Sequence, residues 1–389
     1  MKPDSELKLT KNTGFHERTS KLTRNFVDAR GYWLPNDYTK HGVINEYTAC
    51  REKAVLIDLS SLRKFEILGP DAEELMDYTL TRNVKKLSVG QIVYSSMCYE
   101  NGSMFDDGTL LKMSDHGFRW VCGDEYAGEW LKEQAKKKKF NVLVKNSTDQ
   151  INNISLQGPN SRQILEKFIF TPPTQPSISE LQWFRFTICR VRELSGIPLM
   201  VSRTGYTGEL GYEIWCHPSD APAVWDVLME AGKDEGLIPA GFGALDLLRI
   251  EAGLILFGNE FDGQVDPFEA GVGFTVPLKT KTADFIGKEA LIKRKENPQK
   301  KLVGLELVGK EKANHGDCVH IGRSQVGVVT SGCLSPTLNK NIALCRIDVG
   351  HSEIGMNVEV GKIDGHQKRI PAKIVGFPHY DPQKTRVKS

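Results

Sequence analysis

The stretch Ser202-Arg-Thr-Gly-Tyr-Thr-Gly-Glu-Leu-Gly-Tyr-Glu213 places a run of glycines between two strand-like segments. Residues 199–202 predict one strand and residues 212–216 predict the next. The regularly spaced glycines mark backbone that must turn sharply or lie against something flat. We therefore expect two neighbouring strands joined by a turn of special shape.

The second of these strands carries a carboxylate beside an aromatic ring. Side chains alternate faces along a strand, so Glu213 and Trp215 are expected on the face opposite to Tyr212. A carboxylate beside a tryptophan could receive a planar ligand that presents paired N–H donors. On spacing alone, an ordinary hairpin with an exposed Glu213 is the simpler explanation, and Tyr206 could equally be a core aromatic.

Motifs along nearly the whole chain resemble those of the glycine-cleavage T-protein (aminomethyltransferase) family of folate-dependent one-carbon transferases. The glycine-spaced stretch resembles the family's signature segment, and Asn101-Gly-Ser-Met-Phe-Asp-Asp107 resembles the element with its catalytic aspartate. Further segments follow in family order at residues 31–38, 57–72, 156–159, 267–269, 285–290 and 330–336. The match covers roughly residues 16–380, and its departures from the family pattern indicate a paralogue rather than the housekeeping enzyme.

The resemblance implies an α+β fold, with two α/β subdomains and a C-terminal antiparallel β-barrel around a central folate cavity. We expect a flexible N-terminal tail at residues 1–15, two intertwined subdomains at residues 16–292, and the barrel at residues 300–389. Independently of the family, the polar run at residues 293–301 predicts an interdomain linker. Short β-rich runs with turn signals beyond it are typical of a small antiparallel barrel.

Local patterns predict several further elements. The Asn101-Gly102 pair between residues 91–99 and 104–113 is a strong hairpin signal. Apolar residues at helical spacing predict helices near residues 124–138, 220–231 and 244–256.

The composition excludes several classes of function. The chain has 389 residues, and its 51 basic and 49 acidic side chains give a formal charge of +2, so no strong field favours nucleic acid or a membrane. No run approaches the ~20 apolar residues that a membrane-spanning helix needs. Eight cysteines without a Cys-x-x-Cys pair are typical of thiols in a reducing compartment, so we expect a cytoplasmic protein without a metal site.

Two adjacent aspartates are the candidates for catalysis. Side chains alternate along a strand, so only one of Asp106 and Asp107 can line a given cavity. Without the family, two turn aspartates are the simpler explanation. The resemblance implies that Asp107 is catalytic and lies near the N5/N10 edge of tetrahydrofolate, where its charge would stabilise positive charge on nitrogen or relay a proton. Asp106 is assigned a structural role.

The resemblance places the cofactor tetrahydrofolate against Glu213, Tyr206 and Trp215. Glu213 is the expected pterin anchor, because a carboxylate accepts a bidentate pair from the exocyclic amine and the ring N–H. The change Glu213→Ala should therefore weaken folate binding far more than it disturbs folding. Tyr38 and Trp33 are expected to shape the side where the donor binds, although a core role explains each of them as well.

Three positions depart from the family pattern. Leu245 stands where the family carries an arginine attributed to the folate site, so anchoring of the folate tail must be rearranged. Ser61 replaces the histidine of the family's Asp-x-Ser segment, and Gly108 replaces the leucine after the aspartate pair. These changes favour a paralogue that uses another one-carbon donor.

Charged side chains outside these motifs have simpler explanations. Arg249 has a helix-spaced partner in Asp246, which favours a structural ion pair. The lysines at 136–139 are typical of a solvated helix end, and a docking site for an acidic carrier or a polyglutamyl folate tail is the alternative.

Three functional hypotheses remain. The leading one is an aminomethyltransferase-like enzyme that passes a one-carbon unit to folate N5/N10 from an aminomethyl donor on an H-protein-like lipoyl carrier. The alternative is a tetrahydrofolate-dependent demethylase of a small N-, S- or O-methylated metabolite. The third is a non-catalytic folate-binding accessory protein, which is disfavoured because residues 287–290 lack the cysteine motif of such relatives. The sequence leaves the oligomeric state open.

Overall fold

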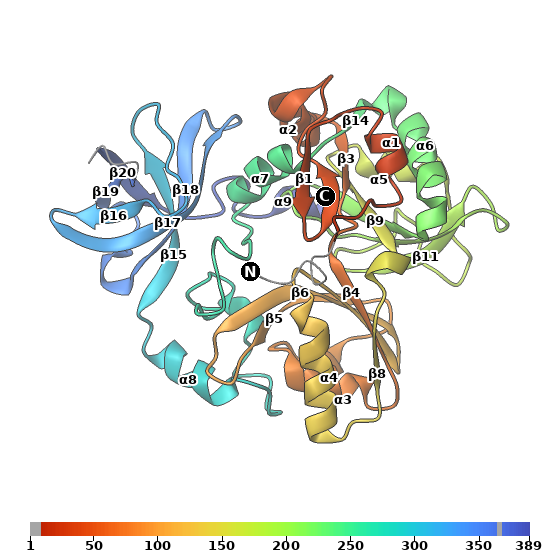
Figure 1. Ribbon diagram of the computed structural model, residues 1–389, viewed down its shortest axis with the longest axis horizontal. Helices are drawn as coiled ribbons and strands as arrows, with labels where there is room; N and C mark the ends of the chain where they lie inside the picture. Colours follow the sequence, from red (N-terminus) through yellow and green to blue (C-terminus); the bar gives the residue numbers. More distant parts are fainter. Residues whose placement is uncertain (1–8, 364–367) are drawn as a thin grey trace.

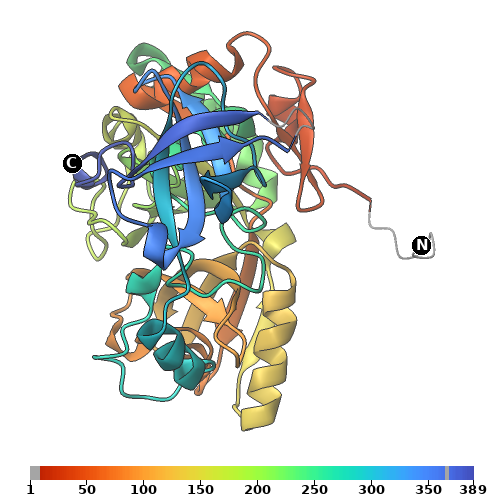
Figure 2. The same cartoon turned by 90° about the vertical axis from the view of Figure 1, so that its left-hand side faces the viewer.

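The computed structural model describes residues 9–363 and 368–389, in which three lobes surround a common centre (Figure 1). One lobe is built on a seven-stranded sheet, the second on a five-stranded sheet, and the third is a closed barrel. In the side view the barrel lies in front of the seven-stranded lobe, and the five-stranded lobe lies below (Figure 2). The predicted α+β fold with a C-terminal antiparallel barrel is confirmed.

The seven-stranded sheet is antiparallel except at one edge, where β14 runs parallel to β3. Its strands, in sheet order, are β10 (Ile169–Phe170), β11 (Phe186–Val191), β12 (Pro198–Ser202), β13 (Gly211–Cys216), β9 (Asn152–Gln157), β3 (Ala54–Asp58) and β14 (Leu237–Pro239). This lobe also contains α1 (His16–Thr19), the hairpin of β1 (Phe26–Ala29) and β2 (Tyr32–Pro35), α2 (Gly42–Glu52), α5 (Ser161–Glu166), α6 (Ala221–Ala231) and α7 (Phe242–Glu251).

Side chains on β13 divide between the two faces of this sheet as the alternation predicts. Tyr212 and Ile214 are fully buried in a cluster with the apolar side chains of α5 and α6. Trp215 instead joins Met200 and Leu111 in a cluster between this sheet and the five-stranded sheet. Glu213 therefore projects from the face that meets the second lobe.

The five-stranded sheet is antiparallel throughout and is covered by helices on one face (Figure 1). Its strands, in sheet order, are β5 (Ile92–Cys98), β6 (Met104–Ser114), β7 (Gly117–Cys122), β4 (Arg63–Leu68) and β8 (Leu143–Asn146). The covering helices are α3 (Ala72–Thr79) and α4 (Tyr126–Lys138), whose apolar side chains share one cluster with the sheet. The predicted hairpin is present, and Gly102 in its turn has a φ of +84°.

The barrel closes because β15 pairs with both β18 and β20. Its strands, in barrel order, are β15 (Lys300–Leu307), β18 (Lys340–Asp348), β17 (Ser324–Ser335), β16 (Cys318–Ile321), β19 (Asn357–Gly361) and β20 (Arg369–Val375). The helix α8 (Lys288–Glu296) precedes the barrel, and α9 (Thr385–Lys388) follows it.

Three local expectations differ from the structure: the linker, the end of one helix and, in part, the N-terminal tail. The expected linker at 293–301 is largely ordered structure, because α8 continues to Glu296 and β15 begins at Lys300. The helix expected to reach residue 256 ends at Glu251, because Gly253 adopts a φ of +64° that stops it.

The expected tail at residues 1–15 lies outside the described residues as far as residue 8. Beyond that point, Lys11 forms backbone hydrogen bonds with Gly31 and Trp33, the residues on either side of Tyr32. Phe15 is fully buried and stands beside Trp225, with ring centroids 6.4 Å apart. Apolar burial therefore holds this part of the chain on the first lobe rather than leaving it frayed.

A buried ion pair of the segment before the barrel joins the barrel to the first lobe by hydrogen bonds to two hydroxyls of β17. On α7, Arg249 donates to Glu260 at 2.9 Å and to the Ser331 hydroxyl of β17 at 2.8 Å. Glu260 also accepts a hydrogen bond from Thr330 at 2.8 Å. The predicted pair of Arg249 with Asp246 is present at 2.8 Å, so it is one contact of a larger network that ties two lobes together.

Candidate functional site

The two adjacent aspartates of β6 project to opposite faces of the five-stranded sheet. Asp106 lies on the helix-covered face and is almost fully buried. Its carboxylate accepts backbone hydrogen bonds from Asp107 at 2.9 Å, Gly123 at 3.2 Å and Asp124 at 3.3 Å. Asp107 is half-buried on the face that meets the seven-stranded sheet. Asp106 thus accepts backbone hydrogen bonds on the helix-covered face, and Asp107 projects from the opposite face.

A tyrosine on the neighbouring strand orients Asp107. Ser96 of β5 stands opposite Asp107, and Tyr94 is the next side chain on that face. The Tyr94 hydroxyl donates to Oδ2 of Asp107 at 2.6 Å. Burial raises the pKa of Asp107 to about 6, although the Tyr94 hydrogen bond and the charge of Arg30 oppose the rise. A carboxylate that titrates near neutral pH is suited to exchanging a proton.

Two aromatic rings lie in the same region. Phe274 is 61% exposed, and its ring centroid is 6.1 Å from that of Tyr94. The Tyr206 hydroxyl donates to the backbone carbonyl of Ile255. Burial raises the pKa of Tyr206, and the negative charge of Asp107 contributes to the rise. Aromatic surface next to a carboxylate suits a flat, polar ligand.

A chain of hydrogen bonds orients Glu213 on β13. The Thr204 hydroxyl donates to Oε2 of Glu213 at 3.1 Å. The Thr204 oxygen lies 2.9 Å from the Ser202 hydroxyl, which in turn accepts from the Trp215 indole at 3.1 Å. Trp215 is only 3% exposed, so it lies at the buried end of this series of hydrogen bonds and packs against the strand. Its expected direct contact with the cofactor stays a prediction.

Glu213 is a half-buried carboxylate with an incomplete set of partners. Within the part of the chain that the structure describes, Oε1 receives no hydrogen bond. Burial raises the pKa of Glu213 to about 7, while the Thr204 hydrogen bond and the positive charge of Lys64 lower it. A carboxylate kept in this state is poised to accept N–H groups from a ligand.

The glycines of the signature stretch have separate structural reasons. Gly208 has a φ of +81°, which side chains rarely adopt. A Cβ atom at Gly205 would come within 2.1 Å of the Gln157 side chain, and one at Gly211 within 2.2 Å. The flat amide of Gln157 therefore lies against both glycines, which agrees with the expectation of close packing on something flat.

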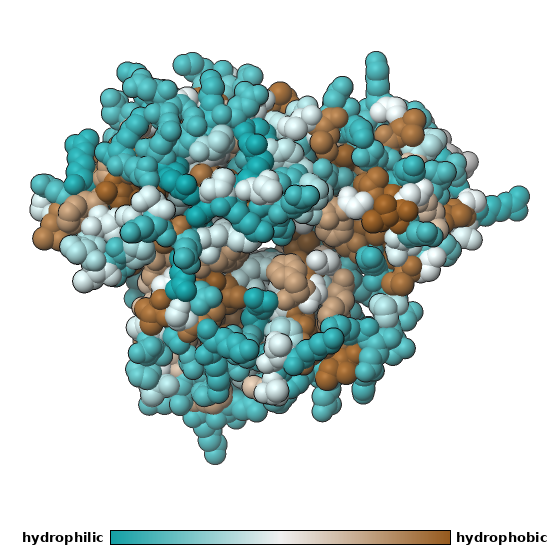
Figure 3. Space-filling model, turned by 180° about the vertical axis from the view of Figure 1, so that it is seen from behind, coloured by the Kyte–Doolittle hydropathy of each residue, from teal (hydrophilic) through white to brown (hydrophobic). Residues whose placement is uncertain are grey.

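The two candidate carboxylates project from sheets that face each other. Asp107 shares a strand face with Leu111, and Glu213 shares one with Trp215. Leu111 and Trp215 pack in the same cluster, so Asp107 and Glu213 flank one contact between the lobes. The space-filling view is hollowed at the centre of the molecule, where the three lobes meet (Figure 3).

The two residues expected on the donor side have different environments. Tyr38 is 1% exposed and packs in the cluster that contains Tyr212, on the sheet face opposite to Glu213. The core role that the sequence left open for Tyr38 is the one that its burial favours. Trp33 is 41% exposed on β2 of the N-terminal hairpin. Neither residue is brought into contact with the carboxylates by a hydrogen bond of the described chain.

Each departure from the family pattern has a local environment. Leu245 is 6% exposed in an apolar cluster against which Tyr206 packs. Ser61 is 1% exposed, and its hydroxyl has no partner among the described residues. A Cβ atom at Gly108 would lie 2.2 Å from the carbonyl of Val121, so no side chain fits there without a shift of the strands.

Sequence reasoning missed three residues of the site. Tyr94 could have been found from the predicted hairpin, but a bulge near Met97 shifts the register that counting from the turn gives. Thr204 lies within the quoted stretch and is an ordinary turn residue by type. Lys64 is the second residue of β4, and its complete burial leaves no local sequence signal.

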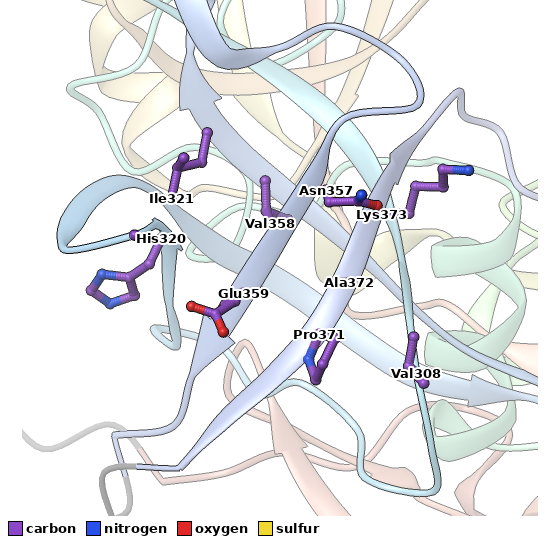
Figure 4. Close-up of a pocket in the computed structure, with 10 residues that line it drawn as sticks. Val308, His320, Ile321, Asn357, Val358, Glu359, Pro371, Ala372 and Lys373 are labelled. Atoms are coloured by element: carbon purple, nitrogen blue, oxygen red, sulfur yellow. The ribbon is translucent and has the colours of Figure 1, made fainter.

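Other features of the surface do not add to this site. The barrel carries a groove of about 480 Å³ on its outer face, between β16, β19 and β20 (Figure 4). None of its ten lining residues belongs to either sheet with a candidate carboxylate. Among residues 9–363 and 368–389, no cluster of acidic, histidine and cysteine side chains could hold a metal ion. No helix in those ranges has the length and apolar character to cross a membrane.

Two family models cover most of the chain. The GCVT N-terminal domain matches residues 15–280, and the glycine cleavage T-protein C-terminal barrel domain matches residues 300–381. The fold is therefore that of a class of folate-dependent one-carbon transferases. The chain belongs to the glycine cleavage T-protein family.

The relatives differ in their named reactions. The chain is 57% identical over 387 residues to the trimethylamine-oxide aldolase of Ruegeria pomeroyi. This alignment covers 100% of this chain and 49% of that protein. The chain therefore spans about half the length of that relative. It is 39% identical to the aminomethyltransferase of Symbiobacterium thermophilum, over 95% of this chain and 97% of that one. The fold is similar to the glycine cleavage system aminomethyltransferase T of Bartonella henselae, with a TM-score of 0.85, 26% identity, and coverage of 96% and 99%.

Proposed function

We propose that this chain is a tetrahydrofolate-dependent one-carbon transferase in which Glu213 holds the pterin and Asp107 acts beside the accepting nitrogens. The observation that carries the proposal is the pair of half-buried carboxylates on facing sheets. Burying such groups is unfavourable unless a ligand satisfies them, so the pair supports a ligand with N–H donors. Membership of the T-protein family supports folate as that ligand.

The surroundings of Glu213 fit the amino-pyrimidine edge of a pterin. Thr204 donates to Oε2 and fixes the plane of the carboxylate, while Oε1 is free to accept among the described residues. A pterin presents an exocyclic amine and a ring N–H side by side, which a carboxylate accepts as two parallel charge-assisted hydrogen bonds. Binding of this kind also removes the penalty of the half-buried charge.

Asp107 supplies electrostatic stabilisation. Tetrahydrofolate, when bound, supplies the nucleophilic nitrogens that take up the one-carbon unit. A fixed carboxylate beside them stabilises the positive charge that develops during transfer, and a pKa of about 6 lets it accept a proton near neutral pH. Tyr94 holds this carboxylate by donating to Oδ2, so its position does not depend on solvent.

The donor favoured by the comparisons is a small N-methylated amine or the one-carbon fragment released from one. An aldolase acting on trimethylamine oxide would yield dimethylamine and formaldehyde, because C3H9NO equals C2H7N plus CH2O. Formaldehyde has the oxidation state of the methylene group that folate carries between N5 and N10. Because the chain spans half of the Ruegeria pomeroyi relative, the proposal for this chain is capture of that fragment on folate.

The competing donor is an aminomethyl group on a lipoyl carrier. The relative from Symbiobacterium thermophilum supports it through its name, whereas Leu245 in place of the family's arginine departs from the aminomethyltransferase pattern. A panel experiment separates the two. The purified chain is incubated with tetrahydrofolate and with formaldehyde, trimethylamine oxide, other methylated amines or an aminomethyl-lipoyl carrier, and mass spectrometry identifies the folate product.

We expect methylene-folate from the formaldehyde arm at a rate above a protein-free blank, which corrects for uncatalysed condensation. The Asp107→Asn variant is the matched control, because it should keep the cofactor and lose the acceleration. Product from the carrier arm alone would support an aminomethyltransferase, and methyl-folate would support a demethylase. Absence of tetrahydrofolate binding in calorimetry would refute the proposal as a whole.

A further inference from the structure

A fully buried lysine lies near the ring of Trp215, on the sheet face from which Glu213 projects. Lys64, at the start of β4, has no exposed surface. Its ammonium donates to the backbone carbonyls of Ser60 at 2.9 Å and Leu62 at 2.8 Å. The same nitrogen lies 5.9 Å from the centre of the Trp215 ring. Two carbonyls and a packed ring therefore fix a positive charge at one place under β13.

The charged groups that face Lys64 come from four strands. Asp58 at the end of β3 and Glu213 on β13 attract it, while Arg63 on β4 and Arg119 on β7 repel it. The Asp58 carboxylate is already used by the Thr13 hydroxyl at 2.6 Å and the Ser60 amide at 2.9 Å.

The repulsion between Lys64 and Arg119 of β7 is partly cancelled by a carboxylate. Arg119 is paired with Glu66 at 2.7 Å. No carboxylate of the described residues lies within 4.0 Å of the Lys64 ammonium, so its influence on Glu213 acts through space. Of the two facing carboxylates, Glu213 is thus the one with an oxygen that receives no hydrogen bond among the described residues. Its ionisation is the one that the lysine charge can favour.

We propose that Lys64 is a positioning residue for the cofactor: its ammonium, held in place by two carbonyls, favours the ionised form of Glu213, so that the carboxylate can accept both N–H groups of the pterin. The inference rests on the proposed folate-binding function. Its physical basis is that a charge buried away from water is poorly screened and strongly biases a nearby titrating group.

The titration of the pair agrees in direction with this role. Burial lowers the pKa of Lys64 to about 7, and the charges of Asp58 and Glu213 oppose that fall. Burial raises the pKa of Glu213, and the charge of Lys64 opposes that rise. Each charge therefore supports the other, and a ligand that bonds to ionised Glu213 also favours the protonated lysine.

The test is the pH dependence of tetrahydrofolate affinity, measured by calorimetry between pH 5.5 and 9 in the full chain. Affinity should rise with pH as Glu213 ionises. In Lys64→Met the pH of half-maximal affinity should move upward by about one unit, as expected for the loss of an opposite charge. The defect should be about fivefold at pH 7, should approach about tenfold below pH 6, and should shrink towards pH 9.

A second buried lysine supplies the matched control. Lys281 is also fully buried, and its ammonium donates to the carbonyls of Leu80 at 2.9 Å and Arg82 at 2.8 Å, beside Asp77. Lys281→Met should lose comparable backbone contacts and stability. It should leave the pH profile of folate affinity unchanged, because it does not face Glu213.

Two further measurements decide the role. In a Glu213→Gln background, Lys64→Met should cause no additional shift of the profile; an additive effect would overturn the inference. If Lys64→Met does not fold, NMR of labelled lysine in Glu213→Gln replaces it, and Lys64 should then titrate at lower pH than in the wild type. An unchanged titration there, or an unchanged profile in Lys64→Met, overturns the role of Lys64 alone. A wild type that does not bind tetrahydrofolate overturns the proposed function with it.

Discussion

Replacing Glu213 by glutamine should separate binding from stability, because the two depend on its charge in opposite ways. Glutamine has the shape of glutamate, and Thr204 can still donate to its carbonyl oxygen. The change removes the half-buried charge and turns one of the two acceptors into an N–H donor. The fold should therefore gain stability while the pterin loses its anchor.

The gain in stability follows from the raised pKa. A rise from 4.5 to about 7 corresponds to at most about 3 kcal/mol. The folded state binds the proton more tightly than the unfolded chain, so this penalty is nearly absent below pH 4.5. It grows between pH 4.5 and 7 and is complete above pH 7. Glu213→Gln should thus raise the free energy of unfolding at pH 8 and change it by less than about 1 kcal/mol at pH 5.

The loss of affinity should be large. One charge-assisted hydrogen bond is lost, and the pterin N–H that faces the new amide is left without an acceptor. Such losses are worth about 2–4 kcal/mol, or roughly 30- to 1,000-fold in the dissociation constant. The wild-type affinity should fall with pH below about 7, because Glu213 must lose its proton before it can bind.

The assay combines calorimetric titration with tetrahydrofolate and urea unfolding at pH 5 and 8. Glu46→Gln is the matched control, since Glu46 is fully buried and accepts backbone hydrogen bonds from Tyr38 at 2.6 Å and Gly241 at 3.0 Å. That variant also loses a buried charge but should keep its affinity, because Glu46 bonds to the backbone of Tyr38 and Gly241 on the opposite side of the first lobe's cluster from the proposed pterin site. A Glu213→Gln protein that binds within threefold of the wild type, or that unfolds more easily at pH 8, would refute the reasoning.

Three further outcomes are expected. Asp107→Asn should lower the transfer rate by about 10²- to 10³-fold with little change in cofactor affinity, and the acid limb near pH 6 should disappear from the rate profile; a rate within fivefold of the wild type would contradict its role. Thr204→Val should weaken tetrahydrofolate binding by about tenfold at pH 7 and by less at pH 9, because its hydroxyl helps Glu213 to ionise; calorimetry at both pH values decides. Arg249→Met should destabilise the protein by about 3–5 kcal/mol in urea unfolding, because Glu260 is left as an uncompensated buried charge. A loss below 1 kcal/mol would show that the pair is not needed.

Much of the fold could be predicted because its signals are local. The strands around Asn101-Gly102, the helix after Asp220 and the strands of the barrel follow turn residues and alternating patterns. The order of the seven-stranded sheet could not be predicted in the same way. It places β9 between β13 and β3, and pairings of such long separation leave no periodic trace in either segment.

The candidate site likewise has features that local sequence signals predict and features that depend on distant parts of the chain. Alternation alone separates Asp106 from Asp107 and puts Glu213 on the face of Trp215. The contacts that tune these groups depend on other lobes or on register. Tyr94 reaches Asp107 past a β-bulge, and the burial of Lys64 is created by strands from two sheets. Type and spacing of residues predict which groups are present, whereas ionisation depends on what surrounds them.

The polar attachment of the barrel constrains how such a chain can be recombined. An interface of apolar side chains tolerates approximate replacement, but a buried guanidinium with its carboxylate does not. The hydroxyls of Thr330 and Ser331 belong to the barrel, while Arg249 and Glu260 belong to the segment before it. A chimera that takes its barrel from a relative must therefore carry matching residues on both sides of this interface. Otherwise a buried charge is left without its partners, and the barrel is no longer held to the first lobe.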